Sequence, residues 1–148
     1  MSELHFAMIF GAHGLMLMVG NRTAVKLSDS DAGMKILRRM NLIQLILTAT
    51  LLLSALLNFL SLWVVLSLTL LIMGVNGAIN PTTAGLFIVH FDKNAGAASS
   101  LKTTAIFVFG AIFGGLAAVL SNGQLLPIFA IMAICSLLAR GVLLTIRD

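Results

Sequence analysis

Charged residues are scarce in this sequence. Asp, Glu, Lys and Arg together make up 9% of the 148 residues, whereas hydrophobic residues make up 59%. Soluble globular domains are roughly one quarter charged, so this composition excludes a soluble domain. The mean hydropathy of +1.09 agrees with that conclusion. We therefore expect an all-α integral membrane protein.

The sequence also lacks the residue patterns of known enzyme sites. It contains 1 Cys, so no disulfide can form within the chain. Cys135 lies in an apolar run without His or Cys at metal-ligand spacing, and we interpret it as a packing residue. There is no Walker A, GxSxG, HExxH or CxxC pattern. We predict no catalytic residue, no metal site, no cofactor and no enzymatic activity.

Acidic residues are absent from the apolar segments, since all five lie in termini or loops: Glu3, Asp29, Asp31, Asp92 and Asp148. A proton-coupled carrier usually needs an acid or a histidine inside the membrane, so this chain alone looks incomplete as an antiporter. The formal net charge of +4 does not indicate nucleic acid, because no basic stripe is interleaved with aromatic residues in a soluble module.

Five segments reach or approach the roughly 20 apolar residues that a membrane-spanning helix needs. Between the first two lies one polar loop, residues 21–39. We predict a single transmembrane bundle over residues 1–148, with spans at approximately 4–20, 40–59, 62–90, 96–120 and 125–144.

The basic residues favour one side of the membrane. The turns at 58–61 and 121–124, on the opposite side, carry no Lys or Arg. The positive-inside bias then predicts a cytoplasmic loop at 21–39, a cytoplasmic C-terminus and an outside N-terminus, in the plasma (inner) membrane. The basic residues are Arg22, Lys26, Lys35, Arg38, Arg39, Lys93, Lys102, Arg140 and Arg147.

An outside N-terminus without a signal peptide, on a first span of about 17 residues, favours a chain that lacks upstream sequence. We expect a fragment whose N-terminal half is absent. The alternative is a complete small protein whose short first span is accommodated by bilayer thinning.

The third span is overlong, roughly 43 Å against a hydrocarbon core of about 30 Å. Asn76, Asn80 and Thr83 share one helical face, and such polar residues either line a watery cavity or bond to a neighbouring helix. We expect a substrate cavity, with interhelical bonding as the equal alternative. Pro81 removes a backbone donor near Gly77, which predicts a helix kink there.

Two other spans carry candidate residues. His13 lies near the middle of the first span, where it contributes to the substrate cavity or a proton relay, or is a neutral ring bonded to the next helix. In the fourth span Gly110, Gly114 and Ala118 are spaced four apart, which favours close helix packing.

Two stretches of the sequence resemble a known family. Asn80 and Pro81, followed by Thr82, Thr83 and Ala84, resemble the end of helix ten in the major facilitator superfamily. The run AGAASSL at 95–101 resembles the start of helix eleven in the same superfamily. More narrowly, they resemble the Bcr/CflA branch of multidrug/proton antiporters. The basic loop at 21–39 is similar to the loop between helices eight and nine.

The resemblance covers nearly the whole chain and implies the C-terminal part of that helical bundle, helices eight to twelve. It implies a secondary active transporter that exports small amphipathic drugs or metabolites, with protons as the coupling ion in the full-length protein. The family's coupling acids lie in the N-terminal half, so they are not carried over. Expected partners are the small-molecule substrate, protons, the lipid bilayer and the missing N-terminal helices.

A rival hypothesis is a stand-alone five-span accessory or structural membrane protein. It would bind a partner membrane protein through the Gly-rich fourth span.

Overall fold

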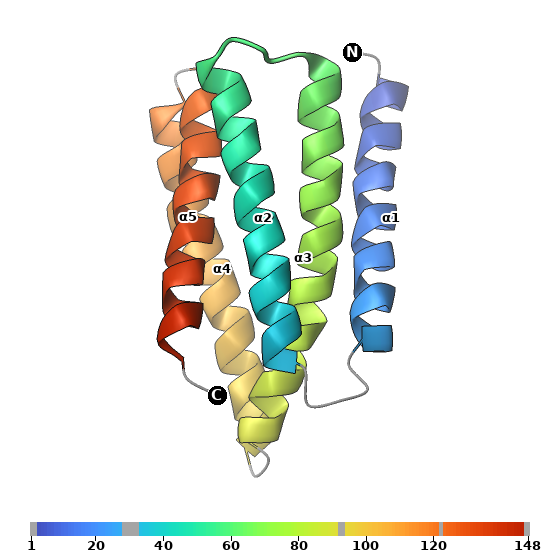
Figure 1. Ribbon diagram of the computed structural model, residues 1–148, viewed down its shortest axis with the longest axis vertical. Helices are drawn as coiled ribbons and strands as arrows, with labels where there is room; N and C mark the ends of the chain where they lie inside the picture. The colour runs from blue at the N-terminus through green and yellow to red at the C-terminus, as the bar shows by residue number, and fades with distance from the viewer. Residues whose placement is uncertain (1–2, 28–32, 92–93, 122, 147–148) are drawn as a thin grey trace.

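A computed structural model describes residues 3–27, 33–91, 94–121 and 123–146, and all regular structure among them is helical. Figure 1 shows the helices side by side, alternating in direction. Their bounds are α1 Glu3–Leu27, α2 Gly33–Leu56, α3 Leu62–His90, α4 Ala95–Leu120 and α5 Leu126–Thr145.

Each of the five helices is long and apolar enough to cross a membrane. The spanning stretches run from 20 residues in α5 to 28 residues in α3. In each of them at most 22% of the most apolar window is buried inside the chain, which leaves the apolar side chains facing outward. The predicted all-α, five-helix membrane architecture is therefore confirmed, and the chain is a multi-pass membrane protein.

The polar loop predicted at 21–39 is shorter than expected, because α1 continues to Leu27 and α2 already begins at Gly33. Arg22, Lys35 and Arg39 are thus helical. The prediction was wrong here because polar residues mark where a helix leaves the hydrocarbon core of the membrane, not where the helix ends. Lys and Arg are good helix formers, so the helix can continue through them. It follows that α1 has 25 residues and is not a short span.

Local sequence explains how the helices are joined. Ser61 caps α3 by accepting a hydrogen bond from the backbone N–H of Val64 at 3.3 Å. The preceding turn needs a positive φ of 56° at Asn58, and the α4–α5 turn uses Gly123 with φ 79°. Pro127 lies in the first turn of α5. A backbone N–H at that position would have no carbonyl partner within the helix, so proline, which lacks the N–H, is tolerated there.

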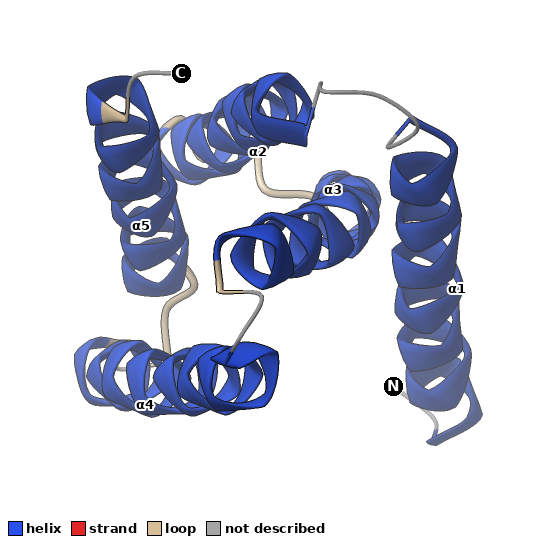
Figure 2. Ribbon diagram, turned by 90° about the horizontal axis from the view of Figure 1, so that it is seen from below, coloured by secondary structure: helices blue, strands red, loops and turns tan. Residues whose placement is uncertain are grey.

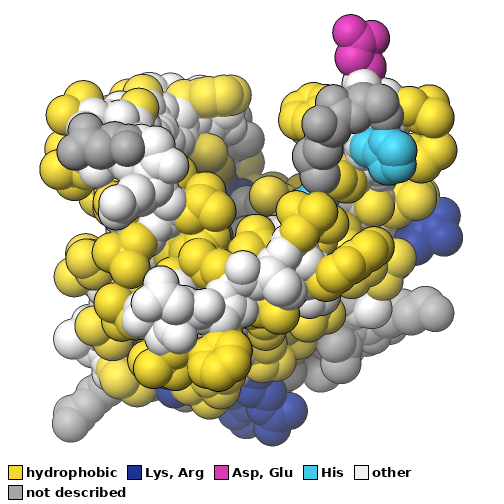
Figure 3. All heavy atoms as spheres, turned by 90° about the horizontal axis from the view of Figure 1, so that it is seen from above, with side chains coloured by type: hydrophobic (Ala, Val, Ile, Leu, Met, Phe, Trp, Pro, Cys, Tyr) yellow, Lys and Arg dark blue, Asp and Glu magenta, His cyan; other side chains and the backbone are white. Residues whose placement is uncertain are grey.

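The two ends of the bundle differ in charge. The last turns of α1, α3 and α5 lie at one end of the bundle, toward the C-terminus, and the first turns of these helices lie at the other end with the N-terminus (Figure 1). Seen from that N-terminal end, the surface is mainly hydrophobic and Lys and Arg appear only at its margins (Figure 3). The described basic residues on α2 therefore belong to the end that carries the C-terminus.

Helix α3 is the central element, with α1, α2 and α4 around it and α5 across from it (Figure 2). The most buried cluster joins α2, α3 and α5 through Leu51, Ala55, Ile72 and Phe129. Helix α4 contacts α3 and α5 only sparsely, and α1 packs mainly on α3.

The α1–α3 contact is a close approach of two backbones at three glycines. A methyl group added at Gly20 would overlap the carbonyl of Gly74, and one added at Gly77 would overlap the carbonyl of Leu17. Ala24 and Ala78 beside them are 2% exposed. Small residues allow this approach, which is a main source of helix association in membranes.

A methyl group added at Gly110 or Gly114 would meet no other part of the chain within 4 Å, and both glycines lie exposed on α4 together with Ala118. The close packing seen within the chain is therefore at the α1–α3 seam. Packing of α4 through its own small residues stays a prediction about a partner outside this chain.

The α1–α3 seam predicts that Gly77→Ala destabilises the protein by about 1–3 kcal/mol, since the methyl group meets backbone that cannot move alone. Thermal unfolding in detergent, followed by circular dichroism, measures it. Gly85→Ala on the same helix is the control, because Gly85 has nothing within 4 Å. Equal melting temperatures for the two variants would contradict the seam.

Candidate functional site

Most hydroxyl side chains in the bundle are bonded to their own helix. The Thr69, Thr83 and Ser136 hydroxyls each donate to the carbonyl four residues earlier, at 2.7–2.9 Å. Such back-bonding satisfies the hydroxyl proton locally. The polar groups left for contacts between helices, or with a ligand, are therefore mainly amides and the histidine.

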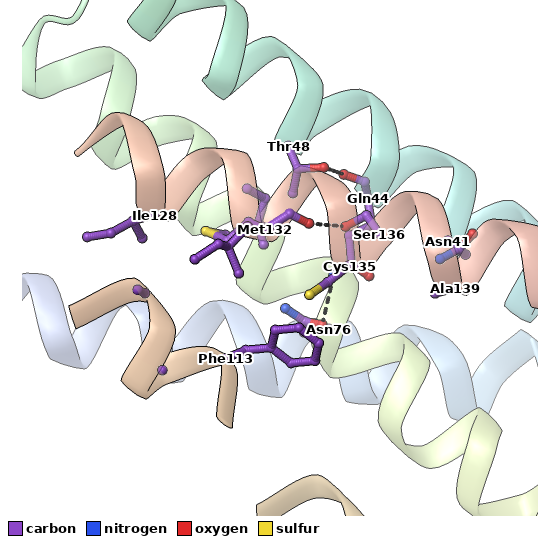
Figure 4. A pocket seen from close by; sticks show the side chains of 14 residues that line it. Asn41, Gln44, Thr48, Asn76, Phe113, Ile128, Met132, Cys135, Ser136 and Ala139 are labelled. Carbon is purple, nitrogen blue, oxygen red and sulfur yellow. Dashed lines mark hydrogen bonds between the residues drawn. The ribbon is translucent and has the colours of Figure 1, made fainter. Parts of the chain in front are cut away.

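A pocket of about 390 Å³ lies between α2, α3, α4 and α5 (Figure 4). Its size falls within the usual range for small-molecule sites. Four of the five helices contribute to its lining, which consists of Asn41, Gln44, Thr48, Ile72, Asn76, Phe113, Gly114, Ala117, Ile128, Ile131, Met132, Cys135, Ser136 and Ala139.

Amide side chains form one wall of the pocket. Asn41, Gln44 and Thr48 are spaced three and four apart on α2, which places them on one face of that helix. Gln44 Nε2 donates to Asn76 Oδ1 on α3 at 3.3 Å. This bond joins α2 to α3 at the pocket and uses one polar group of each amide.

Asn41 differs from the other amides because it is 4% exposed and its Oδ1 is buried without a hydrogen-bond partner. Thr48 and Ser136 cannot supply that partner while their hydroxyls donate to the carbonyls of Gln44 and Met132. A buried acceptor left without a donor costs about 1–3 kcal/mol. Asn41 Oδ1 is therefore a buried acceptor that the described chain does not satisfy.

Most of the remaining lining is apolar. It comes from α4 and α5 and includes Phe113, Ile128 and Met132 (Figure 4). None of the described residues that line the pocket is a Lys, Arg, His, Asp or Glu. The site thus offers an apolar surface, a few uncharged polar groups and a thiol, Cys135.

Of the four residues predicted to share a substrate cavity, only Asn76 lines this pocket. Asn80 is exposed, and its backbone carbonyl accepts from Lys102 Nζ of α4 at 3.1 Å. Thr83 is half-buried and bonded to Ile79. His13 lies between α1 and α3. The structure does not bring the four residues together.

His13 is held by two hydrogen bonds. Its Nδ1 lies 2.7 Å from the carbonyl oxygen of Ile9, and its Nε2 lies 3.1 Å from Thr69 Oγ1 on α3. Because a carbonyl only accepts, Nδ1 carries a proton and donates it to Ile9. The Thr69 hydroxyl has a single proton, which it donates either to the Val65 carbonyl or to Nε2 of a neutral ring. The arrangement matches the interhelical bonding considered from the sequence, and a proton relay remains untested.

Helix α3 runs through Pro81 without a break in helical structure. Its last turns incline toward the start of α4 (Figure 1). Pro81 has no N–H for the carbonyl of Gly77, the glycine that also meets α1. The predicted kink residues, Gly77 and Pro81, thus lie near the end of the α1–α3 contact. Lys102 of α4 bonds to the backbone carbonyl of Asn80, the residue before the proline.

The pocket also contains four polar residues that were not among the predicted site residues: Asn41, Gln44, Thr48 and Ser136. The signal available for three of them was the three-and-four spacing on the second span, the same pattern that identified the face of Asn76. Asn41 lies at the edge of the predicted span 40–59, where an amide side chain can reach water and does not indicate a site. Only the burial of α2 from Ile36 onward shows otherwise.

The chain was compared with known proteins in three ways. No family model, no curated protein and no solved structure matches it. Among the described residues, no group of three or more His, Cys, Asp or Glu could hold a metal ion.

The His13–Thr69 contact predicts an energetic coupling between α1 and α3. In a double-mutant cycle of His13→Ala and Thr69→Val, we expect a coupling of about 0.6 kcal/mol, typical of interhelical hydrogen bonds in membranes. Unfolding in detergent of the wild type, both single variants and the double variant measures it. A coupling of zero would show that the two side chains do not interact.

The pocket predicts that Cys135 reacts with a small uncharged reagent such as N-ethylmaleimide. Gly114→Leu should slow this reaction several-fold, because Gly114 lines the pocket with open space beside it. Gly110→Leu, one turn earlier on α4 and outside the lining, is the matched control. Mass spectrometry follows the modification, and equal rates in the two variants would argue against a pocket at Cys135.

Proposed function

We propose that this chain is part of a secondary active transporter that exports small amphipathic molecules, coupled to proton entry in the full-length protein. The observation that carries the proposal is the pocket lined by α2, α3, α4 and α5, all of which are candidate membrane spans. Substrate sites of transporters typically lie between spans near the middle of the membrane.

The lining supports a solute as the occupant. Amides inside a membrane are unfavourable unless they bond to something, and Asn41 is buried with its oxygen unbonded. A purely structural bundle would gain stability from an aliphatic side chain at that position. A mostly apolar pocket with a few polar groups is also the usual composition of a small-molecule site.

The family resemblance supports the same function. The residues that carry it fall at one place in the fold, the end of α3 with Asn80 and Pro81 and the start of α4 from Ala95. In the proposed transporter α1 to α5 correspond to helices eight to twelve. The site that moves protons lies in the N-terminal half, since the five described spans carry Glu3 as their only acidic residue, at the end of α1.

The distribution of charge supports an orientation. Described Lys and Arg residues cluster at the end of the bundle with the C-terminus, and Glu3 lies at the other end. By the positive-inside bias, the C-terminus lies in the cytoplasm and the N-terminus outside, in the inner (plasma) membrane.

The DNA upstream of the Met1 codon tests the transporter proposal. We expect an in-frame run that encodes about seven more spans, because the resemblance assigns this chain to the last five of twelve helices. Full-length protein in proteoliposomes should then move an amphipathic dye when a proton gradient is imposed, and residues 1–148 alone should not.

Two outcomes would contradict this proposal. One is a stop codon and a ribosome-binding site directly upstream of Met1. The other is proton-driven dye transport by residues 1–148 alone, because the proposal assigns coupling to the absent half.

One observation favours a second function, an accessory protein that binds a membrane partner. Helix α4 is held only sparsely by its neighbours, and Gly110 and Gly114 leave open space on its surface. Such a face accepts the close approach of another helix. A stop codon upstream would favour this alternative.

A further inference from the structure

We propose that the pocket binds a neutral amphipathic molecule through a carboxamide or urea group, which bonds to the side-chain amides of Gln44 and Asn76. This inference rests on the proposed function only in naming that molecule as the transported solute. The binding chemistry follows from the hydrogen bonds of the two amides and from the residues that line the pocket.

The two amides meet in the pocket from different helices. Gln44 of α2 and Asn76 of α3 both belong to the lining, and one bond of 3.3 Å joins Gln44 Nε2 to Asn76 Oδ1. This distance exceeds the 2.7–3.2 Å that is usual for N–H···O bonds, so the bond is weak. A ligand that offers better bonds can therefore take its place.

The pair has polar groups to spare. A side-chain amide has two donor hydrogens and an oxygen with two lone pairs, and within the described part of the chain neither side chain forms a second hydrogen bond. Gln44 Oε1 is thus an unused acceptor and Asn76 Nδ2 an unused donor. Reversing the bond, so that Asn76 donates to Gln44, leaves Gln44 Nε2 and Asn76 Oδ1 instead. In either direction the pair offers one donor and one acceptor.

These unused groups are accessible, in contrast to Asn41 Oδ1, which is fully enclosed. Gln44 and Asn76 are half-buried, and neither Gln44 Oε1 nor Asn76 Nδ2 is an enclosed atom. Figure 4 shows the Asn76 nitrogen turned away from the dashed bond to Gln44. Because both side chains line the pocket, we expect a molecule within it to reach their unused groups.

The polar group of the ligand follows from this offer. A carboxamide or a urea carries a carbonyl acceptor and an N–H donor on separate atoms of one small planar group, so it can bond to both residues. A carboxylate brings only acceptors and an ammonium only donors, and each satisfies one residue of the pair. Among the described lining residues, Cys135 is the only one with an ionisable side chain, so a charged ligand also meets no counter-ion.

The apolar body of the ligand is assigned from the rest of the lining. Phe113, Ile128 and Met132 supply much of that surface. Aromatic rings pack favourably against phenylalanine and against methionine sulfur. The ligand class is therefore an aromatic body that carries a neutral amide or urea.

The test uses the only cysteine of the chain, Cys135, as a reporter within the pocket. The purified 148-residue chain in detergent is treated with N-ethylmaleimide while five probes with one biphenyl body are added in turn. The probes are biphenyl carboxamide, its N,N-dimethyl derivative without a donor, aminobiphenyl without a carbonyl, biphenyl carboxylate and biphenyl methylammonium.

We expect the carboxamide to slow Cys135 modification in a concentration-dependent way, and the other four probes to require at least about tenfold higher concentration. Equal protection by the dimethyl derivative or by aminobiphenyl would overturn recognition by a donor and an acceptor together. Equal protection by either charged probe would overturn the neutral ligand, and no protection by any probe would overturn the site.

Asn76→Leu and Asn80→Leu are a matched pair of variants on α3. Asn76 lines the pocket, whereas Asn80 is exposed one turn later and lies outside the lining. Relative to the same variant without probe, we expect Asn76→Leu to need at least about tenfold more carboxamide for half protection, and Asn80→Leu to match the wild type. Equal behaviour of the two variants would contradict the site.

Thermal unfolding separates binding from a purely structural role of the pair. If the amides only join α2 to α3, Asn76→Leu and Gln44→Met melt lower and the carboxamide changes no melting temperature. Binding predicts in addition that the carboxamide raises the melting temperature of the wild type, because it binds only the folded chain. The rise should be smaller in both variants, and an equal rise in Gln44→Met would overturn the part played by Gln44.

The outcome is separable from that of the proposed function. Carboxamide protection together with a stop codon upstream of Met1 would support this site and overturn the transporter. No protection together with seven further spans upstream would overturn this site and leave the transporter standing.

Discussion

The lack of water inside a membrane is the constraint on which the rest of this structure depends. Each polar group of a spanning helix has to form a hydrogen bond within the protein. Otherwise its burial costs free energy, because no water is present to bond to it. Hydroxyls meet this demand on their own helix, as Thr48, Thr83 and Ser136 do. No amide in the described bundle does so. The described bonds between helices therefore come from other polar side chains, namely Gln44 with Asn76, His13 with Thr69, and Lys102 and Arg140 with backbone carbonyls.

The same medium explains why glycines hold α1 in place. Between two apolar helices in lipid there is no hydrophobic gain from association, so the attraction has to come from close packing and hydrogen bonds. Gly20, Gly74 and Gly77 bring the backbones of α1 and α3 into contact, and His13 with Thr69 adds a polar bond along the same pair. The pocket, by contrast, lies where α4 packs sparsely. The bundle thus has a closely packed side, where α1 meets α3, and a sparsely packed side, where the pocket lies beside α4.

The five spans could be predicted from the sequence because length and apolar composition are properties of one segment at a time. Their ends could not, since Arg22 and Lys35 are polar and helical at once. The site could be predicted only at Asn76. The contributions of α2 depend on which way that helix is rotated in the bundle, and its neighbours decide the rotation. For the same reason Asn80, on the predicted face of α3, is exposed rather than in the pocket.

The choice of an amide at Asn41 can be understood from the free energy of burial. An unpaired amide oxygen costs about 1–3 kcal/mol, which a folded protein with 5–15 kcal/mol of stability tolerates. A buried carboxylate without a counter-ion costs far more, and it takes up a proton instead. An amide is thus a polar group that can stay buried and uncharged between spanning helices, and its charge does not change with pH.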